Sequence, residues 1–395
     1  MGVRFIIYTI SRLSINLAAG LYVVTLIWNI QTLSGSTSIT AFTYAFLGLS
    51  VLIVLPIGPK IDSSKPGAIN IFSIIVQLLV VLTLIIIYGQ SLFTENLIFI
   101  IFLAFVSSVA LDIYVPSSNT LFTQIVPDTF YKKGNSIIQT GDQIVNFLSY
   151  ILVASLIILL GDLTTLVVSL ILFVIGLGLK LYIVSTVKLR GMENEERSFT
   201  ESFKIGFGII KNHDILKYTI PIAIFTNIVV AVIVSLLPSI AQENGIVFYA
   251  SMYVSFFIGF IVGAIISNKL DENLKNLYIL GLLIGITLLV FSLFINSLFA
   301  LIFIMIFGVL SGIINIFDDT IFQNNTPKNE MGNVLTMKIV ILSLATPVGA
   351  SLSGILALTF ENQTIIFMAA VTKITFDLLF LFLFKSKIFV TPIKE

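Results

Sequence analysis

The chain contains no cysteine, a single histidine and few charged residues. The absence of cysteine excludes a disulfide framework and a thiolate metal site. The histidine, His213, lies beside Asn212 and Asp214 with no second ligand nearby, so we interpret it as a solvated surface residue. We therefore expect no metal and no cofactor. A chain so poor in catalytic side chains is also not expected to be an enzyme, which would need a nucleophile with its base or a set of metal ligands.

Charge of either sign is scarce. Only 10% of the 395 residues are Asp, Glu, Lys or Arg, and the net charge of +1 gives no reason to expect nucleic-acid binding. By contrast, 57% of the residues are hydrophobic, and the mean hydropathy is +1.10. No soluble globular protein needs that much apolar surface, so the composition predicts a polytopic membrane protein in contact with the lipid bilayer.

Apolar windows of about 20 residues, the length that crosses the hydrocarbon core, recur along the whole chain. Each must be helical, because a single span has to satisfy its own backbone hydrogen bonds. The first window has no cleavage site and is expected to be a retained span rather than a signal peptide. The sequence thus predicts an all-α fold of twelve transmembrane helices, six and six. The windows are residues 10–33, 38–58, 68–90, 97–118, 136–160, 163–184, 217–238, 247–267, 277–295, 298–318, 334–358 and 364–384.

A polar stretch separates the two sets of windows. We expect residues 1–184 to form one six-helix bundle, residues 185–216 a cytoplasmic linker and residues 217–395 a second bundle. Within the linker, residues 199–212 mix aromatic and aliphatic side chains with charges, which predicts an amphipathic helix on the membrane surface. A simple linker is the alternative. Seven of the 21 Lys and Arg residues gather in and around this stretch: Lys180, Lys188, Arg190, Arg197, Lys204, Lys211 and Lys217.

The other cations indicate the orientation of the chain. Alternate connections between the windows contain no Lys or Arg, whereas the opposite connections, the middle stretch and the C-terminal end carry them. Because cytoplasmic loops are enriched in Lys and Arg, we expect both termini and the linker to be cytoplasmic, in a multi-pass protein of the cell membrane. The connections without cations are residues 34–37, 89–96, 161–162, 239–246, 296–297 and 359–363.

The two halves resemble each other in sequence. Residues 118–122 align with residues 318–322 at an offset of 200, and Pro127 and Pro327 keep that offset. Lys60 and Asp62 recur as Lys269 and Asp271 after the second window of each half. Six spans followed by a weak copy of themselves is typical of a two-bundle transporter with its site between the repeats.

Over its whole length the chain resembles the major facilitator superfamily. Gly58 and Asp62 stand where that family has a Gly-x-x-x-Asp loop, although Ser63 and Ser64 replace the expected basic residues and leave Lys65 as the downstream cation. A narrower resemblance, to the drug:proton antiporters that include macrolide and enterobactin exporters, comes from residues 12–14, 125–135 and 201–216. The resemblance implies a monomeric carrier that exports a small molecule in exchange for protons.

In the first half, ionisable side chains at membrane depth are functional candidates, because they are costly to bury. Arg12 shares a helix face with Tyr8 and Asn16, and Asp112 shares one with Ser108. If these spans converge with the fifth window, Arg12 can neutralise one aspartate and leave the other free to carry a proton. A static Arg–Asp pair is the alternative. Asp142 is the first choice as proton carrier, because its helix face also presents amides for a substrate: Gln139, Gln143 and Asn146, with Asn16 opposite.

In the second half, Asp318 and Asp319 end the tenth window and need a cation partner, for which Lys338 or Lys328 is nearest. We interpret this group, together with the loop residues Asp62 and Asp271, as a cytoplasmic gate. Lys373 and Asp377 are one helical turn apart in the last window and are expected to neutralise each other. The listed candidates for the gate are therefore Asp62, Asp271, Asp318, Asp319 and Lys338.

The function that fits best is export of a small amphipathic molecule, such as a macrolide-like drug, a siderophore or a metallophore, in exchange for protons by alternating access. Export rests on the subfamily resemblance alone. A proton-coupled uptake symporter or a facilitator on the same fold, and a non-transporting membrane sensor, remain open. A channel is disfavoured, because it would show repeated pore motifs rather than two six-span halves.

Overall fold

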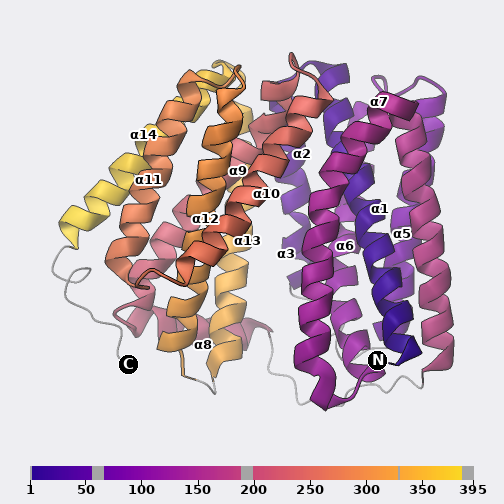
Figure 1. The fold of residues 1–395 in the computed structure, drawn as a ribbon, viewed down its shortest axis with the longest axis horizontal. Helices are drawn as coiled ribbons and strands as arrows, with labels where there is room; N and C mark the ends of the chain where they lie inside the picture. The colour runs from indigo at the N-terminus through magenta and orange to yellow at the C-terminus, as the bar shows by residue number, and fades with distance from the viewer. Residues whose placement is uncertain (1, 56–65, 188–198, 328–329, 385–395) are drawn as a thin grey trace. The chain divides into compact units, whose positions relative to one another are not determined.

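The computed structural model describes residues 2–55, 66–187, 199–327 and 330–384 (Figure 1). Within these ranges, eleven helices are long and apolar enough to cross a membrane. One of them, α7 (Tyr131–Thr186), has 56 residues, which at about 1.5 Å per residue greatly exceeds the roughly 30 Å hydrocarbon core. Its backbone leaves the helical region at Gly161, with φ 82° and ψ 168°, and Figure 1 shows the helix reversing direction. Counting α7 as two spans, the described helices confirm the expected twelve.

The helices form two compact units, Met1–Gly35 with Leu49–Phe199, and Ser36–Gly48 with Thr200–Glu395. The first unit contains α1 (Val3–Ser34), α3 (Ser50–Val54), α5 (Pro66–Gly89), α6 (Leu97–Ile125), the short 3-10 helix η2 (Asp128–Phe130) and α7. The second contains α2 (Thr37–Gly48), α8 (Phe199–Asn212), α9 (Leu216–Ala241), α10 (Ile246–Ser267), α11 (Leu274–Leu293), α12 (Phe299–Asn325), α13 (Met331–Leu356) and α14 (Asn362–Leu383).

Helix α2, which the sequence groups with the first bundle, packs in the second unit. The Tyr44 hydroxyl lies 3.0 Å from that of Tyr253 on α10. Gly48 leaves room for the side chain of Pro347 on α13, because a Cβ at Gly48 would lie 3.1 Å from it. The chain then passes into α3, which contacts α6 of the first unit.

Several helices run beyond the windows expected for them. Helix α6 continues to Ile125 and α12 to Asn325, where the windows end at residues 118 and 318. A window sized to the hydrocarbon core marks where a helix is apolar, whereas backbone hydrogen bonding continues into the polar boundary. Asp318 and Asp319 therefore lie inside α12 rather than at its C-terminal end, and the expectation that they need a cation because they end the helix is wrong.

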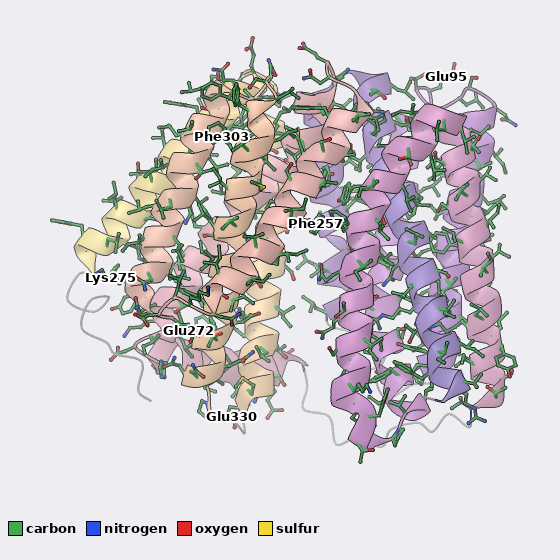
Figure 2. All side chains as sticks on the ribbon, viewed as in Figure 1. Glu95, Phe257, Glu272, Lys275, Phe303 and Glu330 are labelled. Carbon is green, nitrogen blue, oxygen red and sulfur yellow. The ribbon has the colours of Figure 1, made fainter. Side chains whose placement is uncertain are left out.

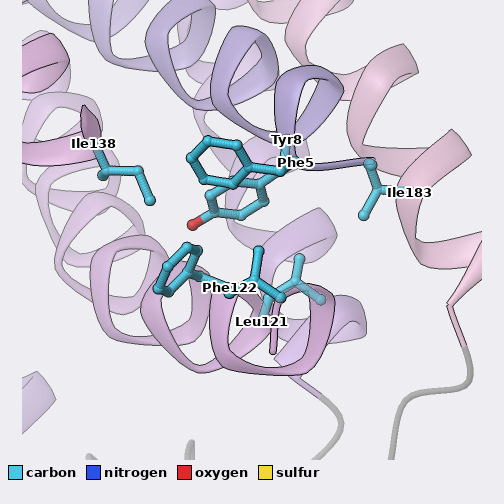
Figure 3. Packing of buried hydrophobic residues seen from close by; sticks show 7 residues of the cluster. Phe5, Tyr8, Leu121, Phe122, Ile138 and Ile183 are labelled. Atoms are coloured by element: carbon cyan, nitrogen blue, oxygen red, sulfur yellow. The ribbon is translucent and has the colours of Figure 1, made fainter. Parts of the chain in front are cut away.

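The first unit is built around α1, which packs between both arms of α7. The Ser11 hydroxyl donates to the Gly176 carbonyl at 2.8 Å, and the Ser169 hydroxyl donates to the Ala18 carbonyl at 2.7 Å. Beneath these contacts is an apolar cluster drawn from α1, α6 and both arms of α7 (Figure 3). Its members are Phe5, Tyr8, Leu121, Phe122, Val126, Ile138 and Ile183.

In the second unit, α10 and α12 approach closely through glycines spaced four residues apart. A Cβ at Gly259 or Gly263 of α10 would collide with the backbone of α12, and a Cβ at Gly308 or Gly312 of α12 would collide with the backbone of α10. Small residues at this spacing allow helix backbones to touch in a membrane, where apolar side chains alone give little drive to associate. The pairing fixes which side chains of the two helices face α9 and α13.

Some charged side chains of the second unit lie near helix ends. Figure 2 shows Glu272, Lys275 and Glu330 there, and Phe257 and Phe303 along the helices. Residues 199–212, the segment expected to be amphipathic, form the helix α8. Its Gly206 lies against the backbone of Asn333 at the start of α13, and Phe207 is 50% exposed.

Candidate functional site

Arg12 is buried in the first unit and holds Asp142 of α7. Its Nη2 lies 2.8 Å from Asp142 Oδ2, its Nε donates to the same oxygen at 3.1 Å, and its Nη1 donates to Asn119 Oδ1 of α6 at 2.7 Å. A guanidinium presents a planar fork of donors, so one side chain can bind a carboxylate and an amide at once. The expected convergence of three spans on Arg12 is thus present, and Asp142 is the aspartate that it binds.

The remaining bonds come from the polar stripe on α1. Asn16 donates to Asp142 Oδ1 at 2.7 Å, so both carboxylate oxygens have partners. The Tyr8 hydroxyl accepts from Arg12 Nη1 at 3.3 Å and donates to the Ser118 carbonyl at 2.7 Å. The Tyr8 ring belongs to the apolar cluster in Figure 3, so the tyrosine joins that cluster to the charged pair.

Asp112 occupies a separate place in the first unit. Its Oδ2 accepts a hydrogen bond of 2.5 Å from Ser50, whose hydroxyl also lies 3.0 Å from that of Ser108. Among the described residues, no Lys or Arg forms an ion pair with Asp112. The two aspartates therefore lie in different environments: Asp142 is bound to a cation, and Asp112 is hydrogen-bonded to the hydroxyl of Ser50.

The three amides expected to accompany Asp142 do not join the Arg12 cluster. Gln139, Gln143 and Asn146 are exposed on the first arm of α7, whereas Asp142 is partly buried. Helical spacing places Asp142 and the three amides on one face of the helix. Asp142 lies at the edge of that face and is partly buried, whereas the amides remain exposed.

Lys180 is the main correction in the first unit. Its sequence position groups Lys180 with the cations of the polar middle, yet it is completely buried on the second arm of α7, the part that follows Gly161. Its Nζ lies 4.5 Å from the centre of the Tyr8 ring and 5.5 Å from that of Tyr114. It has no hydrogen-bond partner among the described residues. Aromatic faces attract an ammonium group, so the two rings take the place of a counter-ion.

In the second unit, Lys338 of α13 bridges two carboxylates of α12. Its Nζ lies 2.6 Å from Asp318 Oδ2 and 2.7 Å from Asp319 Oδ1, which confirms the expected partner. Asp318 is buried, whereas Asp319 is about half exposed (53%). The internal repeat has a counterpart here: residues 118 and 119 accept from Tyr8 and Arg12, and residues 318 and 319 accept from Lys338.

The other ionisable candidates are dispersed. Lys373 and Asp377 of α14 form the expected pair at 2.8 Å, and both face the interior with no exposed surface. Asp271 is exposed between α10 and α11. Asp62, the other loop candidate, lies outside the described residues.

His213, which we expected to be a solvated surface residue, accepts hydrogen bonds from the backbone. Its Nδ1 accepts from the amides of Ile215 and Leu216 at 3.3 and 3.4 Å, at the start of α9. Partial burial lowers the pKa of His213, which favours the neutral ring that can accept these bonds. Within the described ranges, no three His, Cys, Asp or Glu side chains are placed to hold a metal ion.

A family model described as the Major Facilitator Superfamily matches residues 4–338, most of the chain. The chain belongs to the major facilitator superfamily. This membership supports a carrier of small molecules rather than an enzyme. No functionally curated protein is significantly similar in sequence.

Solved structures of transporters share the superfamily fold. The nucleoside transporter NupG has 13% identity, with 97% of this chain and all of that chain covered, and a TM-score of 0.70. A bacterial homologue of the iron transporter ferroportin, inward-facing, has 13% identity, 96% and 99% coverage, and a TM-score of 0.74. A bacterial homologue of the human lysosomal transporter Spinster, inward-facing and unoccupied, has 13% identity, 98% and 96% coverage, and a TM-score of 0.67. Such low identities establish the fold alone.

The sequence analysis of this superfamily member did not single out two functional residues, Asn119 and Lys180, although the sequence indicates both. Asn119 aligns with Asp319 in the internal repeat, so an acceptor at that position was foreseeable. Lys180 lies inside the window of residues 163–184, which marks it as a cation at membrane depth rather than in a loop.

Proposed function

We propose that this carrier exports a small amphipathic molecule across the cell membrane in exchange for protons, with both termini in the cytoplasm. The observation that carries the proposal is the buried Arg12–Asp142 pair, held by Asn16, Asn119 and Tyr8 in a largely apolar bundle. Ionisable groups at membrane depth are expensive and mark proton or substrate pathways. Proton-coupled uptake on the same fold would use the same pair, so the direction rests on the resemblance to drug:proton antiporters.

The geometry supports a specific order of events at Asp142. Arg12 and Asn16 together satisfy both of its oxygens. Protonating Asp142 in place would leave a buried guanidinium without its counter-ion. We therefore propose that Asp142 takes up a proton when another conformation separates it from Arg12, and releases the proton when the pair re-forms. A ligand with different affinities for the two conformations would then be coupled to the proton.

Asp112 is the alternative proton carrier. It is bonded to Ser50 and has no cation partner among the described side chains, so a proton there would disturb no ion pair. The Ser50 hydroxyl can also reorient, so that it donates to the carboxylate or accepts from the carboxylic acid.

Substrate contacts are proposed for the open amides of α7. Gln139, Gln143 and Asn146 are exposed next to Asp142, and each can donate and accept hydrogen bonds. Asp271 and Asp62 stay proposed members of a cytoplasmic gate.

Proteoliposomes that report internal pH test the proposal. Asp142→Asn keeps the shape of the side chain but cannot titrate, so it should abolish proton-driven accumulation while downhill exchange of substrate survives. Asp112→Asn is the matched variant in the same assay. Normal pumping by Asp142→Asn together with failure of Asp112→Asn would exchange the two roles. Pumping by both variants would show that neither aspartate carries the proton.

A further inference from the structure

The second unit contains a cavity of about 190 Å³ between α9, α10, α12 and α13. Polar side chains from α9, α12 and α13 line it, and so do Phe256 and Phe260 from α10. The glycine contacts between α10 and α12 hold the two sides in place. The polar lining is Thr226, Asn227, Ser311, Asn315, Asp318, Asp319 and Lys338.

Three polar oxygens in this lining lack a hydrogen-bond partner within the described chain: Thr226 Oγ1, Ser311 Oγ and Asp318 Oδ1. Their residues are only 5%, 8% and 6% exposed. Leaving a buried polar group unpaired costs on the order of 1–3 kcal/mol, and most buried polar groups in proteins are paired. Three such atoms around one cavity indicate a position for a ligand that bonds to them.

Every available atom can accept a hydrogen bond, and the two hydroxyls can also donate one. Asn227 gives one amide hydrogen to the Ala223 carbonyl at 2.8 Å, which leaves its carbonyl oxygen and its second amide hydrogen. Lys338 is shared between Asp318 and Asp319, so one ammonium faces two carboxyl groups, and the three side chains carry one excess negative charge when all of them are ionised. A ligand that supplies a positive charge and several N–H donors would satisfy these atoms.

We propose that this cavity binds the alkylammonium group of a small organic amine, with the ammonium on Asp318 Oδ1 and the hydroxyls of Thr226 and Ser311. The lining favours an organic cation over a bare ion, because it includes aromatic rings beside the polar oxygens. Rings of this kind attract ammonium ligands. A drug-sized ligand usually occupies about 300–1,000 Å³, so this cavity fits a small amine or the amine end of a larger molecule.

This inference rests on the proposed carrier function, because it names the class of substrate that the carrier would move. It replaces the gate role of Asp318 and Lys338 with a binding role. Sequence could have pointed to the site, since Ser311, Asn315 and Asp318 recur at helical spacing on α12.

Calorimetric titration of the purified full-length protein tests the inference without a proton gradient. The probe is phenethylammonium, and 2-phenylethanol is its uncharged counterpart. Each is titrated in two buffers of equal ionic strength, one containing potassium salt and one containing sodium salt. We expect saturable binding of the amine and none of the alcohol. Asp318→Asn should weaken binding about tenfold or more, as for loss of a charge-assisted hydrogen bond. Ser311→Ala should weaken it roughly two- to tenfold.

Asp319→Asn is the matched control. It removes the same charge one residue along the helix but leaves the unpaired oxygen of Asp318 in place, so its effect should be clearly smaller than that of Asp318→Asn. If Asp318→Asn does not fold, the amine affinities of the Ser311→Ala and Thr226→Val variants test the assignment instead. No saturable amine binding, equal loss in both aspartate variants, or unchanged affinity in both hydroxyl variants would overturn the assignment.

Two further results separate the possibilities. If sodium alone gives a heat of binding and its presence prevents amine binding, the cavity is an inorganic cation site. That result would overturn the amine assignment. A protein that binds the amine as expected but does not couple its transport to protons would refute the proposed exchange and leave the cavity's ligand class standing.

Discussion

Replacing one partner of the Lys373–Asp377 pair should destabilise the protein by an amount that depends on pH. Both side chains are fully buried, and their charged atoms lie 2.8 Å apart. Breaking a buried pair typically costs about 3–5 kcal/mol. Lys373→Met leaves an isolated carboxyl, which can escape that cost by taking up a proton. For a carboxyl with an ordinary pKa of about 3.9, protonation costs about 4 kcal/mol at pH 7 and about 1.5 kcal/mol at pH 5.

The opposite single variant should show the opposite pH dependence. Asp377→Leu leaves an isolated amine, and removing its proton costs about 4.6 kcal/mol at pH 7 but about 2 kcal/mol at pH 9, given an ordinary pKa of about 10.4. The deficit of Lys373→Met should therefore shrink as the pH falls, and that of Asp377→Leu should shrink as the pH rises. The double variant should be close to the parent at every pH, because no buried charge is left.

Denaturant titration in mild detergent, followed by circular dichroism from pH 5 to 9, measures all four proteins. Gly281 leaves room for this pair, since a Cβ there would be 2.6 Å from Asp377 Oδ2. Leu at position 377 has the same branched shape as Asp, with methyl groups in place of the two oxygens. Single variants as stable as the parent at pH 7, or a double variant as unstable as either single one, would refute the reasoning.

Three other predictions concern the surface and the orientation. Because the chain has no native cysteine, Asn244→Cys should react with an impermeant thiol reagent from outside intact cells and Asn268→Cys should not; the reverse pattern would invert the topology. His213 should titrate below the ordinary value of about 6.5, because burial lowers its pKa. Asp214→Asn should lower the midpoint further, since that carboxylate raises the pKa, and an NMR midpoint at or above the ordinary value would contradict this. Phe207→Glu should make a spin label on α8 more accessible to water-soluble relaxation reagents, because about 1.5–3 kcal/mol of apolar burial is lost. Unchanged accessibility would mean that α8 does not rest on lipid.

As the pH falls through the folded-state pKa of His213, the bonds from the amides of Ile215 and Leu216 should be lost. A lowered histidine pKa means that the folded protein prefers the neutral ring. The stabilisation is therefore present above the ordinary pKa and declines on acidification.

Sequence alone determined the features that depend on local composition. The spans follow from runs of apolar residues, because the bilayer offers no partners to an open backbone. The pairing of Lys373 with Asp377 follows from helical spacing, since residues one turn apart are neighbours on the same helix. Convergence of Arg12 with an aspartate was foreseeable for a similar reason, because a buried cation needs an anion and few were available.

Only the tertiary structure decided which groups meet across helices. Arg12 binds Asp142 rather than Asp112 because of how α1, α6 and α7 are rotated about their axes, and no spacing within one helix specifies that rotation. The same rotation buries Lys180 between two tyrosine rings. The cavity beside Asp318 needs four helices held at a distance that the glycine contacts of α10 and α12 set. Composition shows that a polar group is buried, but packing alone decides which atoms are left without a partner.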